Sequence, residues 1–200
     1  MSKIILKTAL ITISALILSA VAVFSLWILI SPQSMVTVSE QICNYSFAAT
    51  CADIKYRYSG EEEFLIISAE DAILAENNTK IVKFCSNFVG YERFEEICRE
   101  KDEQFKNGEF KLYTKDYRSY IFGSLSAAQY EKDDLDGAIS NAAKGGAKSF
   151  VNLILKVGEK KDKPAAKKII PALDGIIGNG ETTAEDAEML EDLKVILEKI

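Results

Sequence analysis

The pattern of apolar and polar positions divides the chain into one long apolar run and a series of short amphipathic segments. Residues 9–30 contain no charged side chain. At about 1.5 Å of rise per residue, a helix over this run reaches about 33 Å, which is enough to cross the hydrocarbon core of a bilayer. We therefore expect a transmembrane anchor over 9–30, a short N-terminus over 1–8 and a polar linker over 31–39.

The charges that flank the apolar run predict its orientation. Lys3 and Lys7 precede it, and the first charge after it is Glu40. The basic side of a span stays in the cytoplasm, so we expect a single-pass protein with a cytoplasmic N-terminus and an extracytoplasmic body. A cleaved signal peptide is the alternative, because residues 20–22 (Ala-Val-Ala) resemble a cleavage site, and a buried core helix is a third interpretation. The apolar run continues to Ile30, however, which is longer than most secretory signals.

From residue 40 onward, apolar residues recur at helical spacing, and no alternating pattern long enough for a strand is present. The sequence predicts an all-α protein with four helices over 40–104, a connecting loop over 105–116, four more helices over 117–177 and a C-terminal capping helix over 182–200. Pro171 should kink or split the last of the eight. The expected helices cover 40–59, 62–76, 79–89, 91–104, 117–131, 134–144, 147–158 and 163–177.

Turn chemistry supports the helix ends of the second half. Asp133 and Asp134 stand between two helices, where an aspartate side chain caps free N–H groups. Gly145 and Gly146 follow the next helix, where the chain needs a residue with positive φ. Thr79 is expected to cap the helix over 79–89.

The two halves of the body resemble one another. Residues 75–90 match residues 143–158 at several positions, among them Gly90 with Gly158. Each half then contains two helical hairpins of roughly 34 residues, which is the size range of helical repeats. The sequence therefore predicts an internal duplication.

The best-defined motif is the tract YEKDDLDGAI over residues 130–139. Together with the residues that precede it, this tract resembles the helix-turn-helix pattern of tetratricopeptide and Sel1-like repeats. The Trp and Gly-Tyr of the first helix and the Pro that ends a repeat are missing, and an Asp stands where those families have the turn Gly. The residues that carry the resemblance are Phe122, Leu125, Ser126, Tyr130, Ala138 and Ile139.

This resemblance implies a stack of antiparallel helical hairpins, a tetratricopeptide-like solenoid, that binds peptides or proteins. By the same resemblance, the first-helix positions that face the binding groove are Arg57 and Tyr58 in the first half and Tyr120 and Tyr130 in the second. The alternative is that the aromatic residues pack the joint between the halves, since an aromatic stripe at helical spacing usually belongs to a core.

Charge and composition exclude several functions. The chain carries a net charge of −6 although two of its lysines precede the apolar run, so the body is acidic and unsuited to nucleic acid. It contains no histidine, which removes the commonest general base, the commonest metal ligand and every Ser-His or Cys-His pair. Its carboxylates stand mostly at helix starts. We expect no cofactor and no metal site.

The four cysteines leave two interpretations open. Cys43 and Cys51 would lie about 12 Å apart on one straight helix, too far for a disulfide, so they could pair only if the helix begins after about residue 45. Cys85 and Cys98 are expected on consecutive helices and could form one. The alternative is four buried thiols that act as small apolar residues. No CxxC spacing points to metal binding.

These observations favour a non-enzymatic scaffold or adaptor that binds a protein partner at the extracytoplasmic face of a membrane. A hydrolase that uses a carboxylate pair is the alternative from another class. A structural membrane protein whose anchor over 9–30 associates with itself is the third hypothesis.

Overall fold

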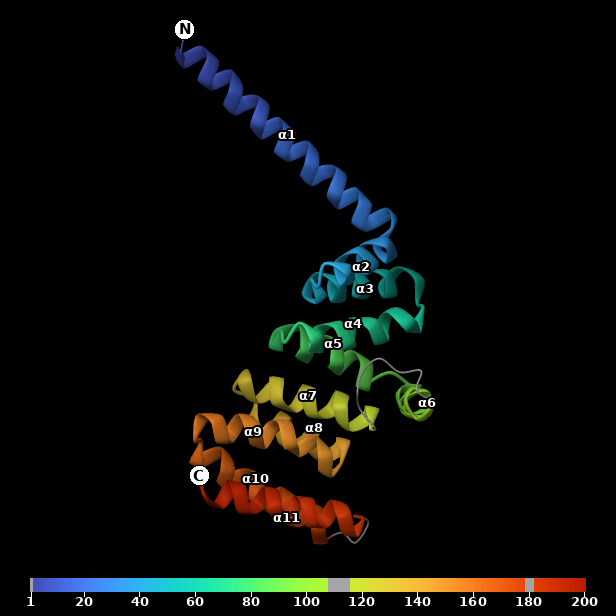
Figure 1. Ribbon diagram of the computed structural model, residues 1–200, viewed down its shortest axis with the longest axis vertical. Coiled ribbons are helices and arrows are strands. Elements are labelled where there is room, and N and C mark those ends of the chain that lie inside the picture. Colours follow the sequence, from blue (N-terminus) through green and yellow to red (C-terminus); the bar gives the residue numbers. More distant parts are fainter. Residues whose placement is uncertain (1, 108–115, 179–181) are drawn as a thin grey trace. The chain divides into compact units, whose positions relative to one another are not determined.

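The computed structural model describes residues 2–107, 116–178 and 182–200, with side chains from residue 7 onward. Of the described residues, 86% are helical and none forms a strand, so the all-α prediction is confirmed. The helices, shown in Figure 1, are α1 (Ser2–Ile30), α2 (Pro32–Gln41), α3 (Tyr45–Ser59), α4 (Glu62–Leu74), α5 (Asn78–Val89), α6 (Phe94–Lys106), α7 (Tyr117–Glu131), α8 (Leu135–Gly145), the 3-10 turn η1 (Ala147–Ser149), α9 (Phe150–Lys160), α10 (Lys163–Gly178) and α11 (Ala184–Glu198).

The chain forms two compact units, Met1–Ser68 and Ala69–Ile200. The boundary falls within α4, whereas the sequence places the division between the halves in the loop over 105–116. Most of that loop, 108–115, lies outside the described residues, and its first two residues belong to α6.

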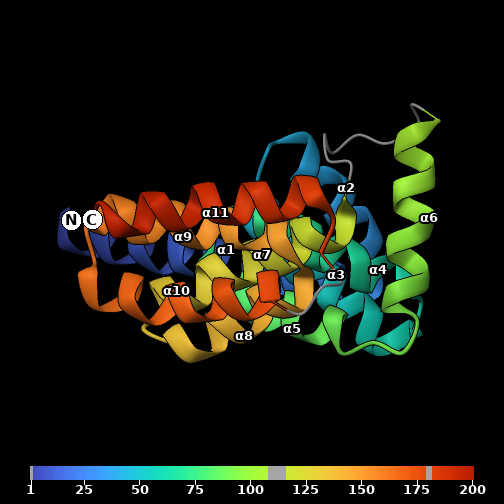
Figure 2. The same ribbon diagram turned by 90° about the horizontal axis from the view of Figure 1, so that it is seen from below.

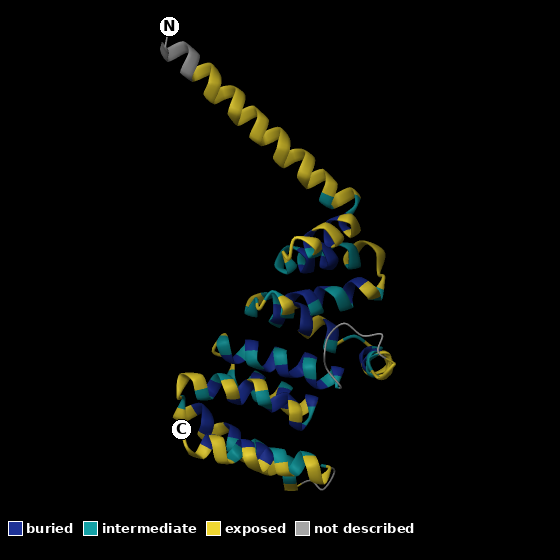
Figure 3. Cartoon of the chain, in the orientation of Figure 1, coloured by how far each residue is buried: buried dark blue, intermediate teal, exposed yellow. Residues whose placement is uncertain are grey.

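In the first unit, α1 is the apolar helix that the sequence predicts. Its segment Lys7–Ile30 is long and apolar enough to cross a membrane, and none of its apolar window is buried by the protein. Figure 3 shows this exposure along nearly the whole helix. By length and composition the helix is a candidate membrane span, and a signal sequence near an N-terminus has the same two properties.

Most of the segment expected to be a linker over 31–39 belongs to the helix α2, which runs from Pro32 to Gln41. Pro32 begins the helix, at a position where the backbone N–H has no partner within the helix, so its absence costs nothing. Met35 and Val36 are both 3% exposed because they pack in one cluster with Phe64 of α4 and with residues of α3. This burial depends on contacts with residues distant in the sequence, so the short polar stretch itself carries no pattern that indicates it.

The helix expected over 40–59 is broken between Ile42 and Asn44. Cys43 adopts a left-handed conformation with φ of 56°, and α3 begins at Tyr45. Asn44 caps α3, its side chain accepting the N–H of Phe47 at 3.2 Å. The single helix predicted from apolar spacing is therefore two helices joined by a tight turn.

In the second unit, α7 to α11 pack around a common core that includes Phe150, Leu153, Ile169 and Leu190. Figure 2 shows α6 running across the direction of α7 and α11. Helix α10 runs through Pro171 without being split there. Thr183 caps α11, its side chain accepting the N–H of Asp186 at 3.1 Å.

Four turns share one backbone construction. In each turn a non-glycine residue at positive φ follows the end of a helix. The next residue is an Asn or Asp, and its N–H donates to the carbonyl of the residue five positions earlier. The side chain of this Asn or Asp caps the following helix. The turns join α2 to α3, α4 to α5, α7 to α8 and α9 to α10, at Cys43-Asn44, Glu76-Asn77, Asp133-Asp134 and Lys161-Asp162.

These turns change two local assignments. Asn77, not Thr79, caps α5 and accepts the N–H of Lys80 at 3.1 Å. The expected duplication pairs the α4–α5 turn with Gly146, but Gly146 joins α8 to η1 with a φ of 87° and a different construction. The turn that corresponds in geometry to Glu76-Asn77 is the one that follows α7.

Candidate functional site

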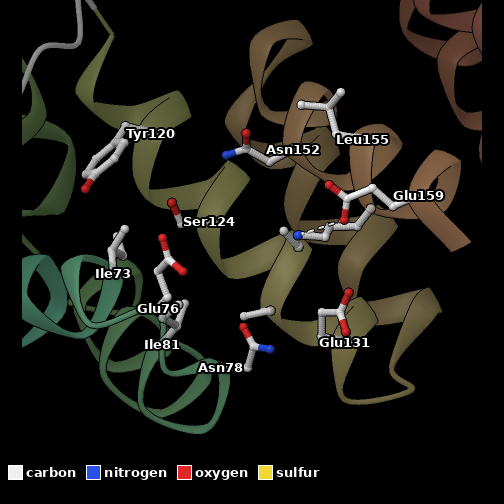
Figure 4. A pocket seen from close by; sticks show the side chains of 13 residues that line it. Ile73, Glu76, Asn78, Ile81, Tyr120, Ser124, Glu131, Asn152, Leu155 and Glu159 are labelled. Carbon is white, nitrogen blue, oxygen red and sulfur yellow. Dashed lines mark hydrogen bonds and ion pairs between the residues drawn. The ribbon is translucent and has the colours of Figure 1, made fainter. Parts of the chain in front are cut away.

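A groove of about 610 Å³ opens on the second unit, and we refer to it as the groove. It is lined from one side by the end of α4 and the start of α5, along its floor by α7 and from the other side by α9, as Figure 4 shows. The lining residues are Ile73, Glu76, Asn78, Ile81, Tyr120, Ser124, Ala127, Ala128, Glu131, Asn152, Leu155, Lys156 and Glu159.

The floor of the groove is made of small side chains. On α7 the lining positions follow helical spacing from Tyr120 through Ser124 and Ala127 to Glu131, so they form one stripe along the helix. Short side chains in the middle of this stripe leave the space that the longer residues at its ends enclose. The same spacing on α9 aligns Asn152, Lys156 and Glu159 along the opposite wall.

The walls carry more acidic than basic groups. Glu76, Glu131 and Glu159 are three carboxylates, and Lys156 is the one ammonium among the lining residues. Lys156 donates to Glu159 at 2.9 Å, while Glu131 pairs at 3.0 Å with Lys160 just outside the groove. The hydrogen bond to Glu159 raises the pKa of Lys156, and the charges of the other two carboxylates raise it further. The groove is therefore polar, with a surplus of negative charge.

Two lining side chains offer contact area to a bound molecule. Leu155 is 58% exposed on the α9 wall, although a leucine on a packed helix is usually turned inward. The half-buried Tyr120 presents its ring at one end of the groove, as Figure 4 shows. Tyrosine combines apolar area with a polar tip, which suits recognition of a polypeptide.

Of the four residues predicted for the groove, the structure places only Tyr120 in it. Tyr130 is 6% exposed, its hydroxyl donates to Asp162 at 2.9 Å, and Lys160 stands over its ring at 4.8 Å. At about 100° per residue, ten residues turn Tyr130 about 80° around α7 from Tyr120. Tyr130 thus holds the α9–α10 turn.

Arg57 and Tyr58 belong to α3 in the first unit, whereas all lining residues belong to the second. Arg57 pairs with Asp53 at 3.1 Å on the same helix, and Tyr58 is 75% exposed. A binding role for these two residues therefore stays a prediction. The repeat resemblance assigns Arg57 and Tyr58 to the first helix of a pair, whereas the shared turn at Cys43-Asn44 makes α3 the second helix of its pair.

The remaining aromatic residues pack the core, as the alternative interpretation predicts. Tyr117 is fully buried and donates to Glu70 of α4 at 2.8 Å, and Glu70 also pairs with Lys101 of α6 at 3.0 Å. Asp102 accepts the backbone N–H of Tyr117 at 2.8 Å. Burial and the nearby carboxylate raise the pKa of Tyr117 well above its usual value. This network joins α4, α6 and α7 below the groove.

All four cysteines are free thiols in the structure, and only Cys43 is exposed. Burial raises the pKa of Cys85, and it raises that of Cys98 to about 12, so both remain protonated at neutral pH. The sulfur of Cys85 contacts the carbonyl of Ala69 at 3.9 Å. A bond between Cys85 and Cys98 stays a prediction that thiol labelling can test.

Within the ranges that the structure describes, no group of three His, Cys, Asp or Glu side chains is placed to hold a metal ion. Comparison with protein-family models, with curated proteins and with solved structures finds no match to this chain.

Proposed function

We propose that this protein is a membrane-anchored, non-enzymatic adaptor that holds a segment of a protein partner in the groove of its second unit. The proposed anchor is α1, and Lys3 and Lys7 on its N-terminal flank favour an extracytoplasmic position for the second unit. The groove is the observation that carries the proposal.

The arrangement of the helices supports a repeat-like binding surface. The shared turns pair α4 with α5, α7 with α8 and α9 with α10, and the groove is lined mainly by α7 and α9, the first helices of two of these pairs. First helices form the binding face in the tetratricopeptide-like stack that the tract over 130–139 resembles. A degenerate solenoid of hairpins is thus the architecture that we propose for the second unit.

The chemistry of the groove indicates what the partner segment contributes. A surplus of carboxylates favours lysine or arginine in the bound segment. Lys156, the one lysine among the lining residues, pairs with Glu159 and not with Glu76. The small floor around Ala127 admits a polypeptide backbone, and Leu155 offers an apolar contact. A basic peptide segment of a few residues with one apolar side chain fits these features.

Site-specific photocrosslinking of the full chain in its native membrane tests this function. A photoreactive residue at Tyr120 should yield an adduct that maps to one basic segment of one partner. Ser124→Arg fills the floor of the groove and should abolish the adduct, while the matched change Ser140→Arg on the exposed face of α8 should leave it intact.

The proposal fails if Ser124→Arg and Ser140→Arg give the same adduct in the same yield, because the captured protein then does not occupy the groove. Topology has a separate test, since protease added to intact cells should digest the second unit. Complete protection of the second unit would contradict the orientation but would leave the groove in place.

A further inference from the structure

The uncharged character of the N-terminal segment continues beyond α1. Between Lys7 and Asp53, Glu40 is the only charged side chain, although charged residues make up 27% of the chain. Helix α2 and the first half of α3 are otherwise made of apolar, Ser, Thr, Gln and Asn residues. A helix that faces water normally carries charges opposite its buried face, so this stretch has the composition of a less polar environment.

Apolar side chains are exposed where α2 meets α3. Val38 is 39% exposed and Ile42 is 68% exposed, and their spacing of four residues places them on one face. The next residue, Cys43, is also exposed. We refer to Val38, Ile42 and Cys43 as the corner. No described residue of the first unit covers it.

The first unit itself ties α3 to the last turns of α1. The ring of Phe47 in α3 stacks on Phe24 of α1, with centroids 5.8 Å apart and planes at 20°. Ile28 of α1 packs against the cluster that contains Met35. Phe24 precedes Ile30 by six residues, or about 9 Å of helix, so the start of α3 is held beside the end of α1 and not beyond it. Figure 1 shows α2 turning back from that end.

The position of α1 in a bilayer then determines what surrounds the corner. Trp27, which is 46% exposed, lies one turn before the end of α1, where interfacial aromatic residues are common. With Trp27 at the interface, a segment held level with Phe24 lies within the polar layer of the membrane or deeper.

We infer that the corner inserts into the interfacial layer of the bilayer that holds α1, with Val38 and Ile42 against the lipid. The backbone is prepared for such a setting. The N–H of Cys43 donates to the carbonyl of Glu40 at 2.9 Å, and that of Asn44 donates to the carbonyl of Ser39 at 2.7 Å. The turn therefore brings no unpaired N–H of these two residues into the lipid. This inference concerns a surface other than the groove and rests only on α1 lying in a membrane.

The exposed thiol of Cys43 provides the probe. The full chain, labelled at Cys43 with an environment-sensitive nitrobenzoxadiazole dye and placed in phosphatidylcholine nanodiscs, should show blue-shifted emission. Lipids that carry a nitroxide near the glycerol should quench the dye strongly, and iodide in the water should quench it weakly. The matched control is Cys43→Ser with Ser59→Cys, which moves the dye to the exposed far end of α3 and should reverse both quenching results several-fold.

A second pair of variants separates insertion from mere proximity. Ile42→Asp should lower lipid quenching of the Cys43 dye several-fold, while Gln33→Asp, half a turn around α2 from Ile42, should not change it. Equal quenching of the dyes at 43 and 59 would overturn the inference. Oxidative crosslinking of Cys43 to Cys43 in native membranes would also overturn it, because a second copy and not lipid would then cover the corner. Loss of the full chain from the nanodisc would refute the premise itself.

Discussion

Replacement of Gly145 by alanine tests a close approach between α7 and α8 in the second unit. Gly145 ends α8, and a Cβ atom added there would overlap the Cβ of Phe122 and the hydroxyl of Ser149, and would stand 2.9 Å from the Cβ of Ser149. The hydroxyl could rotate away, but the Cβ of Phe122 cannot move without the backbone of α7. We therefore expect α7 and α8 to separate.

The cost follows from two contacts. Overpacking of a tight core position typically costs about 1–3 kcal/mol. Ser149 also donates to the carbonyl of Ser119 at 3.2 Å, and the loss of this buried hydrogen bond adds about 1 kcal/mol. The total of about 2–4 kcal/mol should lower the Tm by roughly 5–15 °C in a chain of this size.

Gly175→Ala is the matched control. Gly175 lies inside α10, and an added Cβ meets nothing within 4 Å. Alanine is favoured over glycine in a helix interior by about 1 kcal/mol, so this variant should be slightly more stable than the parent. Thermal unfolding of the full chain in detergent micelles, followed by circular dichroism, gives both values. A Gly145→Ala protein that melts within 2 °C of the parent (about 1 kcal/mol at most) would refute the packing argument.

Three further predictions concern single groups. Because the pKa of Tyr117 is raised, this residue keeps its proton in the folded protein well beyond pH 10, whereas the unfolded chain releases it near pH 10. The free energy of unfolding should therefore fall above pH 10 by up to about 1.4 kcal/mol per pH unit. Denaturant titrations of Tyr117→Phe should show a shallower fall. Thiol labelling of the native chain should modify Cys43 alone, and after unfolding all four cysteines should react without a reductant; two thiols that appear only after reduction would instead establish a disulfide. Asp134→Ala removes the cap on the N–H of Gly137 at 3.0 Å and should cost about 1 kcal/mol in chemical unfolding, while Asp133→Gly, which relieves a φ of 63°, should cost nothing.

Local signals in the sequence were sufficient where a structure depends on near neighbours. Helix α7 runs over 117–131, as predicted, because Asp116 caps it and the turn at Asp133 ends it. The positive φ predicted at the glycine pair is found at Gly146. The apolar helix α1 follows from composition alone, since length and absence of charge are properties of the segment itself.

The groove could not be derived in the same way. Tyr120 and Tyr130 lie on one helix and both have the residue type expected of a binding face, yet one lines the groove and the other supports a turn. The difference comes from tertiary packing, which places Tyr120 in one groove with residues of α4 and α9 and brings the α9–α10 turn to Tyr130. Lys156 and Glu159 gave no signal in the sequence beyond an ordinary helix surface.

The sequence by itself thus determined the helical class, the apolar helix and most helix ends, because these depend on spacing, caps and charge within a few residues. Only the tertiary structure decided that 32–41 is a packed helix and that residues of α4, α5, α7 and α9 line one groove. Those features depend on side chains far apart in the chain. Met35 is buried in a cluster with Phe64, 29 positions later in the chain, and the residues around Met35 do not indicate that contact.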